Sequence, residues 1–224
     1  MDVTAEQLQE QMATALSAGD VPAYCAAEDG FENALLEQAS ALFRSGQFAA
    51  SATYYEAMRQ LNEQLLDVLK SLPEATDAAE SGNGRTPIAA ARERAPSLLA
   101  SWEAMRDFAA AHALRLDGRF QEAQTQFLTA AAAFDRSAEE RQAATARATA
   151  TSCEGFQNLK LGYFRAAAAK FQGAEAQFQQ ADQIQDTEST GAVEDAAAKS
   201  IDVQFSHAMY LTAASRADLI EGRP

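Results

Sequence analysis

Apolar residues in this chain fall into amphipathic segments, in which small and large side chains alternate on one predicted helical face. Short polar stretches that contain Gly separate several of these segments. Only 5 Pro and 11 Gly occur in 224 residues, whereas Ala, Gln, Glu, Leu and Arg are abundant. These residue types favour helix over strand. We therefore predict an all-α protein.

Helix starts are indicated by two capping boxes, in which a hydroxyl accepts a hydrogen bond from a free backbone amide and a later side chain reaches back. The two segments are Thr4-Ala5-Glu6-Gln7 and Ser137-Ala138-Glu139-Glu140. We expect helices to begin just after Thr4 and just after Ser137. A third start is expected near Pro87, because the amide hydrogen that Pro lacks is not used in the first helical turn.

Breaks between helices are indicated by turn-forming residues. The stretch 72–86 collects acidic residues and turn formers and has no apolar stripe, which is typical of a long mobile loop. Pro96 interrupts the next apolar pattern, so the sequence predicts a short helix over 88–94 and a longer one over 96–116. A second polar stretch, 182–190, precedes a final helix.

Three segments of the chain, which begin at Gly46, Gly118 and Gly162, align with one another without gaps. The Gly suits a tight turn between antiparallel helices, because it adopts left-handed backbone conformations at little cost. Five positions later a small residue lets the preceding helix approach, and four positions beyond that an aromatic residue fills the space between hairpins. The small residues are Ser51, Ala123 and Ala167, and the aromatic residues are Tyr55, Phe127 and Phe171.

This pattern resembles the second half of the tetratricopeptide repeat (TPR), a helix–turn–helix unit that stacks into a superhelix. Seven residues before each Gly, where the family has a small residue, this chain has Ala39, Ala111 and Gly155. The family's period of about 34 residues is absent, because the three Gly residues are 72 and 44 positions apart. The resemblance implies a divergent TPR-like solenoid of stacked hairpins, and an ordinary helical bundle is the alternative.

The resemblance also implies how the chain is divided. We expect residues 1–224 to form a single TPR-like domain. Its expected parts are N-terminal helices over 1–30, hairpin one over 31–71, the mobile loop over 72–86, hairpin two over 87–136, hairpin three over 137–183 and a C-terminal capping helix over 191–219.

A TPR-like fold presents a concave face that is lined by the first helix of each hairpin and binds a protein or peptide. Arg44, Arg115 and Lys160 are at nearly the same level of successive hairpins, so the resemblance implies a cationic row that attracts carboxylates or an acidic peptide. Alternatively, these three residues are solvated helix ends. The expected partner-binding residues are Phe43, Arg44, Met105, Phe108, His112, Arg115, Phe156, Leu159 and Lys160.

The charge balance restricts the classes of partner. The chain has 18 basic and 32 acidic side chains, a net charge of -14, which opposes binding to nucleic acid. Neither an export signal nor an apolar run of about 18 residues is visible, so we expect a cytoplasmic protein without membrane insertion. Cys25 and Cys153 lack metal-ligand spacing and are expected to be reduced, buried thiols.

Candidate catalytic groups are few. The two imidazoles, His112 and His207, are far apart in the sequence, and neither pairs with a Cys at a recognisable spacing. Neither a Glu-x-x-His pair nor a phosphate-binding Gly-rich motif occurs, so we expect no enzyme activity and no cofactor. We expect a non-enzymatic adaptor or scaffold. The alternatives are a ligand-sensing regulatory domain and a structural protein that assembles into a homo-oligomer through its repeats.

Overall fold

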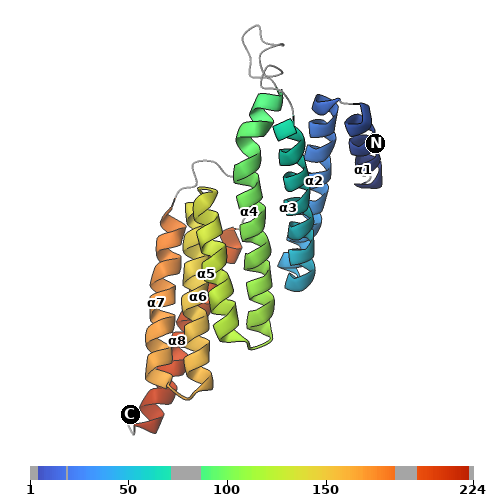
Figure 1. Ribbon diagram of the computed structural model, residues 1–224. Coiled ribbons are helices and arrows are strands. Elements are labelled where there is room, and N and C mark those ends of the chain that lie inside the picture. The colour runs from blue at the N-terminus through green and yellow to red at the C-terminus, as the bar shows by residue number, and fades with distance from the viewer. Residues whose placement is uncertain (1–4, 19, 72–86, 185–195, 222–224) are drawn as a thin grey trace. The chain divides into compact units, whose positions relative to one another are not determined.

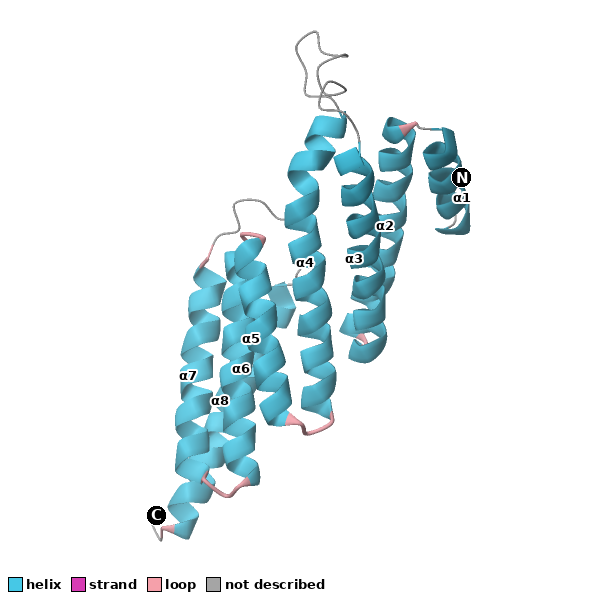
Figure 2. Ribbon diagram, in the orientation of Figure 1, coloured by secondary structure: helices cyan, strands magenta, loops and turns pink. Residues whose placement is uncertain are grey.

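The computed structural model describes residues 5–18, 20–71, 87–184 and 196–221, and every regular element in these ranges is an α-helix (Figures 1 and 2). The all-α prediction is therefore confirmed for the described residues. Thr4, the predicted mobile loop 72–86 and most of the polar stretch 182–190 lie outside them. The helices are α1 (Ala5–Ala18), α2 (Val21–Arg44), α3 (Phe48–Ser71), α4 (Pro87–Leu116), α5 (Phe120–Arg136), α6 (Glu140–Lys160), α7 (Phe164–Gln183) and α8 (Ala196–Ile220).

The chain divides into two compact units, an N-terminal unit over residues 1–106 and a C-terminal unit over residues 107–224. Helix α4 contributes residues 87–106 to the first unit and residues 107–116 to the second. Helix α2 continues through Gly30, so the end of the predicted N-terminal segment and the start of hairpin one belong to the same helix.

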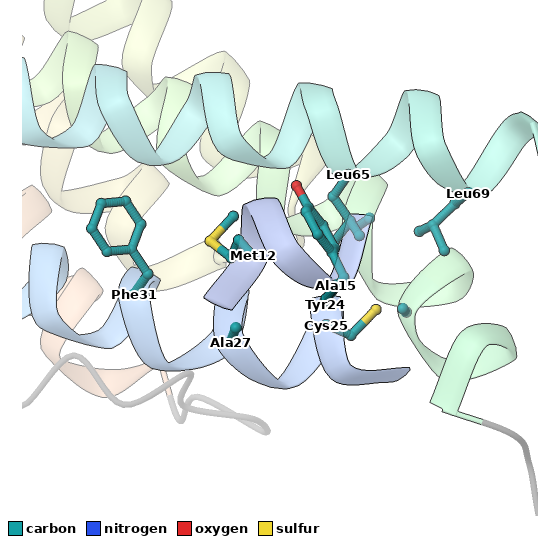
Figure 3. Packing of buried hydrophobic residues seen from close by; sticks show 10 residues of the cluster. Met12, Ala15, Tyr24, Cys25, Ala27, Phe31, Leu65 and Leu69 are labelled. Carbon is teal, nitrogen blue, oxygen red and sulfur yellow. The ribbon is translucent and has the colours of Figure 1, made fainter. Parts of the chain in front are cut away.

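The core of the N-terminal unit contains residues from all four of its helices. Figure 3 shows Leu65 and Leu69 of α3 pointing toward side chains of α1 and α2. Burial of this apolar surface stabilises the unit, because each large aliphatic side chain contributes about 1.5–3 kcal/mol. The buried residues of the cluster are Met12, Ala15, Tyr24, Cys25, Ala27, Phe31, Leu65, Leu69, Ala91 and Ala95.

Helix α4 runs through Pro96 without a break, so the predicted interruption at this residue is wrong. A Pro inside a helix removes one backbone hydrogen bond and typically costs about 3 kcal/mol. In α4 the ring of Pro96 is exposed, whereas Ala95 before it and Trp102 after it are buried. Apolar burial on both sides of Pro96 therefore offsets the local cost and keeps the two segments in one helix.

The core of the C-terminal unit consists mostly of Ala and Phe. One cluster joins Ala111 of α4 and Phe127 of α5 to Cys153 of α6. A second cluster joins Phe171 of α7 and Ala213 of α8, with Phe156 of α6 packed against it. Helix α6 therefore packs against α4 and α5 through one set of side chains and against α7 and α8 through another.

The three repeated Gly residues form the predicted tight turns. Gly46, Gly118 and Gly162 have φ values of 77°, 72° and 79°. The Gly118 amide donates to the Arg115 carbonyl, and the following amide donates to a carbonyl five residues earlier. This pair of bonds is the Schellman motif, and it recurs at Gly46 and Gly162. The repeated pattern thus correctly predicts both the position and the conformation of these turns.

A fourth turn of the same kind connects α5 to α6, and it contains Ala where the others have Gly. Ala138 has φ 62°, its amide donates to the Asp135 carbonyl, and the Glu139 amide donates to the Phe134 carbonyl. The Ser137 hydroxyl donates to the Phe134 carbonyl at the end of α5. The predicted capping box at Ser137 is therefore wrong, because this residue ends α5 and α6 begins at Glu140.

The small and aromatic positions of the repeated pattern are buried as predicted. The Ser51 hydroxyl donates to the Ala39 carbonyl of the preceding helix at 2.8 Å. A Cβ atom added at Gly155 would lie 2.8 Å from the ring of Phe171, which leaves no room for a side chain. Small residues therefore permit close helix approach. At most 1% of the residue surface is exposed at Ser51, Tyr55, Ala123, Phe127, Ala167 and Phe171.

Candidate partner-binding surface

The predicted partner-binding residues are distributed between the two units. Phe43, Arg44 and Met105 belong to the N-terminal unit, where Arg44 is exposed and the other two are half-buried. The remaining six belong to the C-terminal unit, where Lys160 is exposed, His112 is buried and the others are half-buried. Whether the cationic row extends from Arg44 to Lys160 stays a prediction.

Phe108 and His112 contribute mainly to the core beneath the predicted surface. The Phe108 ring packs edge-on against Phe127, with ring centroids 5.3 Å apart, and also contacts Phe134. Burial holds the pKa of His112 well below its usual range, and the Arg115 charge lowers it further. The imidazole is therefore neutral at physiological pH and adds no positive charge to the surface.

Phe156 links three helices within the C-terminal unit. Its ring stacks on Phe120 of α5 at 5.2 Å, meets Phe171 of α7 edge-on at 5.0 Å and lies 6.0 Å from Phe205 of α8. Leu159 packs against the same core. These residues were expected to contact a partner, but most of their surface contacts neighbouring helices.

The structure brings Arg115 and Lys160 to the same end of the C-terminal unit. The Lys160 ammonium lies 3.5 Å from the Gly118 carbonyl, so the turn after α6 is next to the turn after α4. The Arg115 charge adds to the effect of burial in lowering the pKa of His112, and it partly opposes the effect of burial in raising the pKa of Cys153. Lys160 at the end of α6 therefore lies beside the turn that follows Arg115 on α4.

Large apolar side chains are exposed at these two turns. Leu116 is 66% exposed at the end of α4, and Leu161 and Tyr163 are 55% and 61% exposed at the turn after α6. We call Arg115, Leu116, Lys160, Leu161 and Tyr163 the turn end. Leu161 and Tyr163 are not among the residues predicted from the sequence, although a Leu-Gly-Tyr turn places both beyond the apolar faces of the adjoining helices.

The two cations of the turn end differ from several other cations of the C-terminal unit in whether they form salt bridges. Within the described residues, neither Arg115 nor Lys160 forms a salt bridge, whereas four other cations pair with carboxylates. These pairs are Arg119–Glu122, Arg147–Asp135, Arg165–Glu221 and Lys170–Glu154. The polar contact of Lys160 is instead with the Gly118 carbonyl.

A second polar cluster, which was not predicted from the sequence, lies inside the N-terminal unit. The Glu32 carboxylate accepts hydrogen bonds from the Asn62 amide at 2.5 Å and from the Trp102 indole. Glu28, one turn earlier on α2, is only 1% exposed. The sequence contains one signal for burial of these two side chains. Glu28 and Glu32 lie on the same helical stripe as Tyr24 and Leu35, at spacings of three and four residues.

The thiols are unsuited to nucleophilic chemistry. Both Cys25 and Cys153 are free and buried, as the sequence predicts. Burial, reinforced at Cys25 by the nearby Glu28 and Asp29, raises the pKa of each thiol to about 11. A thiol with such a pKa is almost entirely protonated at neutral pH, and the thiolate is the reactive form.

None of the helices in the described ranges is long and apolar enough to cross a membrane. No group of three or more His, Cys, Asp or Glu side chains in the same part of the chain has an arrangement suited to a metal ion. Comparison with known proteins gives no match to any family model, curated protein or solved structure.

Proposed function

We propose that this protein is a non-enzymatic adaptor, built as a divergent TPR-like array, whose turn end binds an acidic segment of a partner protein. The observation that carries the proposal is the turn end itself, where three exposed apolar side chains adjoin two cations that make no salt bridge within the described residues. Exposed large apolar groups that lie close together mark interaction surfaces.

Two features of the C-terminal unit support a repeat architecture. Each of its helix connections within the described residues is the same Schellman turn. Helix α6 contributes to the core with α4 and α5 and also to the core with α7 and α8. In repeat proteins each hairpin packs against its neighbours in this way and presents a continuous surface to a partner.

The physical roles within the turn end differ. Leu116, Leu161 and Tyr163 would supply most of the affinity, because burial of apolar surface is the dominant favourable term in association. Arg115 and Lys160 would orient a carboxylate-bearing segment and accelerate its encounter. A local cationic site on a chain of net charge -14 also directs an acidic partner to one surface, because the partner is repelled from most other surfaces.

Selection of peptides from a displayed random library by the native protein tests this proposal. We expect the selected peptides to contain Asp or Glu beside an apolar residue. The double variant Arg115→Glu, Lys160→Glu should bind them at least about tenfold more weakly at low salt, and the difference should shrink at high salt. The matched control Arg136→Glu, Arg216→Glu changes the net charge equally within the same unit and should bind normally. Equal binding by both double variants would contradict the proposal.

Self-assembly is a second candidate function, and exposed apolar residues on α8 favour it. Leu211, Leu219 and Ile220 are 52%, 76% and 70% exposed. A second copy of the chain packing on this helix would bury them. Sedimentation velocity of the native protein and of Leu211→Ser, Leu219→Ser tests this candidate, since only the native protein should show a concentration-dependent increase in mass.

A further inference from the structure

The strongest feature outside the turn end is the Glu28 cluster, which we define as Glu28, Glu32, Asn62 and Trp102. These side chains come from α2, α3 and α4, and they are 1%, 8%, 0% and 8% exposed. A buried carboxylate is costly unless donors or cations compensate its charge. Two carboxyl groups inside one helical core therefore require compensation of their charge or its removal by protonation.

Hydrogen-bond donors are fewer than acceptors in this cluster. The Asn62 amide nitrogen donates to Glu32 and to the Met58 carbonyl, and the Trp102 indole also donates to Glu32. The Glu28 Oε1 and Asn62 Oδ1 atoms are buried and accept no hydrogen bond from any described residue. The cluster has two unsatisfied acceptors, and a proton on a carboxyl group is the smallest addition that supplies a donor.

The surroundings of Glu28 do not neutralise its charge. On α2 its titratable neighbours are Tyr24, Cys25, Asp29 and Glu32, and α4 contributes Arg94. Arg94 is bound by the Asp29 carboxylate in an exposed salt bridge. From α3 the cluster receives the neutral Asn62, and the core residues of α1, Leu8, Met12 and Ala15, are apolar.

Burial, reinforced by Glu32 and Asp29 and opposed by Arg94, raises the pKa of Glu28 to about 8. Burial also raises the pKa of Glu32, although its bonds from Asn62 and Trp102 work in the opposite direction. Between the two carboxyl groups, hydrogen bonds favour a negative charge on Glu32, which accepts two, over one on Glu28, whose Oε1 accepts none from the described residues. This assignment agrees with the shortage of donors.

We propose that Glu28 holds one proton inside the N-terminal unit at neutral pH, and that loss of this proton in mildly alkaline solution loosens the packing of α2 against α3 and α4. The step is a simple dissociation, in which the Glu28 carboxylic acid releases a proton to solvent and leaves a carboxylate next to Glu32. Repulsion between the two carboxylates and the demand of Glu28 for water then favour opening of the cluster.

Trp102 provides a direct test, because it is the one Trp in the chain and donates to Glu32. Its fluorescence should shift to longer wavelength as pH rises, with a midpoint near 8 in the native full-length protein. Glu28→Gln should abolish the transition, since a carboxamide supplies a donor and does not titrate. The control Glu37→Gln removes an exposed carboxylate from the same helix and should keep the native transition.

The proposal is overturned if native fluorescence is constant from pH 6 to about 9.5, or if Glu28→Gln shows the same transition as the native protein. A fluorescence change on adding EDTA at pH 7 would also overturn it, because a metal cation would then occupy the cluster. If Glu28→Gln does not fold, carbon-13 NMR of Glu carboxyl groups in the native protein decides. One resonance should titrate near pH 8, and titration of all of them below pH 6 would refute the proposal.

Discussion

The two units achieve close helix packing by different means. In the C-terminal unit, Ala and Gly face Phe, as Gly155 does against Phe171. In the N-terminal unit, the contacts of α2 with α3 and α4 include two buried carboxyl groups, of which Glu32 accepts hydrogen bonds from Asn62 and Trp102. The first arrangement depends on side-chain volume and the second on protonation, so the two units should respond to different perturbations.

The largest effect is expected from truncation of an aromatic residue in the C-terminal unit. Phe171→Ala should lower the free energy of unfolding by about 3–5 kcal/mol, because Phe171 is fully buried between helices. Urea denaturation followed by far-ultraviolet circular dichroism measures the loss. Tyr163→Ala, at an exposed position, should cost no more than about 0.5 kcal/mol and serves as the control. If Phe171→Ala loses as little unfolding free energy as Tyr163→Ala, the core does not depend on Phe171.

The N-terminal unit should instead lose stability as pH rises. Between pH 4.5, the ordinary pKa of Glu28, and about 8, the unfolded chain has released the Glu28 proton and the folded chain retains it. Stability then falls by about 1.4 kcal/mol per pH unit, or about 3 kcal/mol from pH 5 to pH 7. Urea denaturation monitored by Trp102 fluorescence at several pH values checks this slope.

A second carboxylate, Glu56, determines how the stability of the N-terminal unit changes at acidic pH. A hydrogen bond from Arg59, assisted by Arg106, lowers the pKa of Glu56 to about 2 despite partial burial. Its contribution to stability is lost as pH falls from 4.5 toward 2, so the unit should be most stable near pH 5. Glu28→Gln should flatten the profile above pH 5 and leave the acid side unchanged. An unaltered slope above pH 5 would assign the pH dependence to other groups.

A smaller effect is expected from filling the contact between α6 and α7. Gly155→Ala should destabilise the C-terminal unit by about 1–3 kcal/mol, because the added methyl group would overlap the Phe171 ring. Gly173→Ala is the matched control, since its Cβ would lie 3.9 Å from the nearest atom, a Thr151 methyl carbon. This variant should gain up to about 1 kcal/mol from helix propensity. Thermal unfolding of both variants measures the contrast, and equal shifts would refute the role of volume.

The smallest effects concern the turns. Gly118→Val should cost about 1 kcal/mol or more, because a β-branched residue is strained at φ 72°. Ala138→Gly should gain about 1 kcal/mol, because it relieves the same strain in the turn between α5 and α6. Melting temperatures should therefore move in opposite directions. A decrease for Ala138→Gly would indicate that the Ala138 side chain stabilises the turn by contacts that outweigh the strain.

The features that the sequence predicts correctly are local. Gly46, Gly118 and Gly162 each determine a turn through their own conformational freedom, and the small and aromatic positions follow at fixed spacings. The predictions are wrong where residues distant in the sequence determine the local structure. Pro96 stays within α4 because side chains on both sides of it are buried, and Ser137 caps the end of α5 although its sequence matches a helix start.

The candidate sites were predicted less completely for the same reason. The TPR resemblance indicated Arg115 and Lys160 through their level in successive hairpins, and the structure places Lys160 beside the turn that follows Arg115. Leu161 and Tyr163 were missed, because their exposure depends on how the hairpins pack. Burial of Glu28 likewise depends on α3 and α4, which are far from it in the sequence.

The Schellman turns have a consequence for how this molecule can change over evolutionary time. Their hydrogen bonds join backbone groups, and the conformation depends on one residue with positive φ. The flanking side chains can therefore be exchanged at little cost to folding, as Ser45 and Gln47 in one turn and Leu161 and Tyr163 in another illustrate. Substitutions at these positions offer a route to new binding specificity that leaves the scaffold intact.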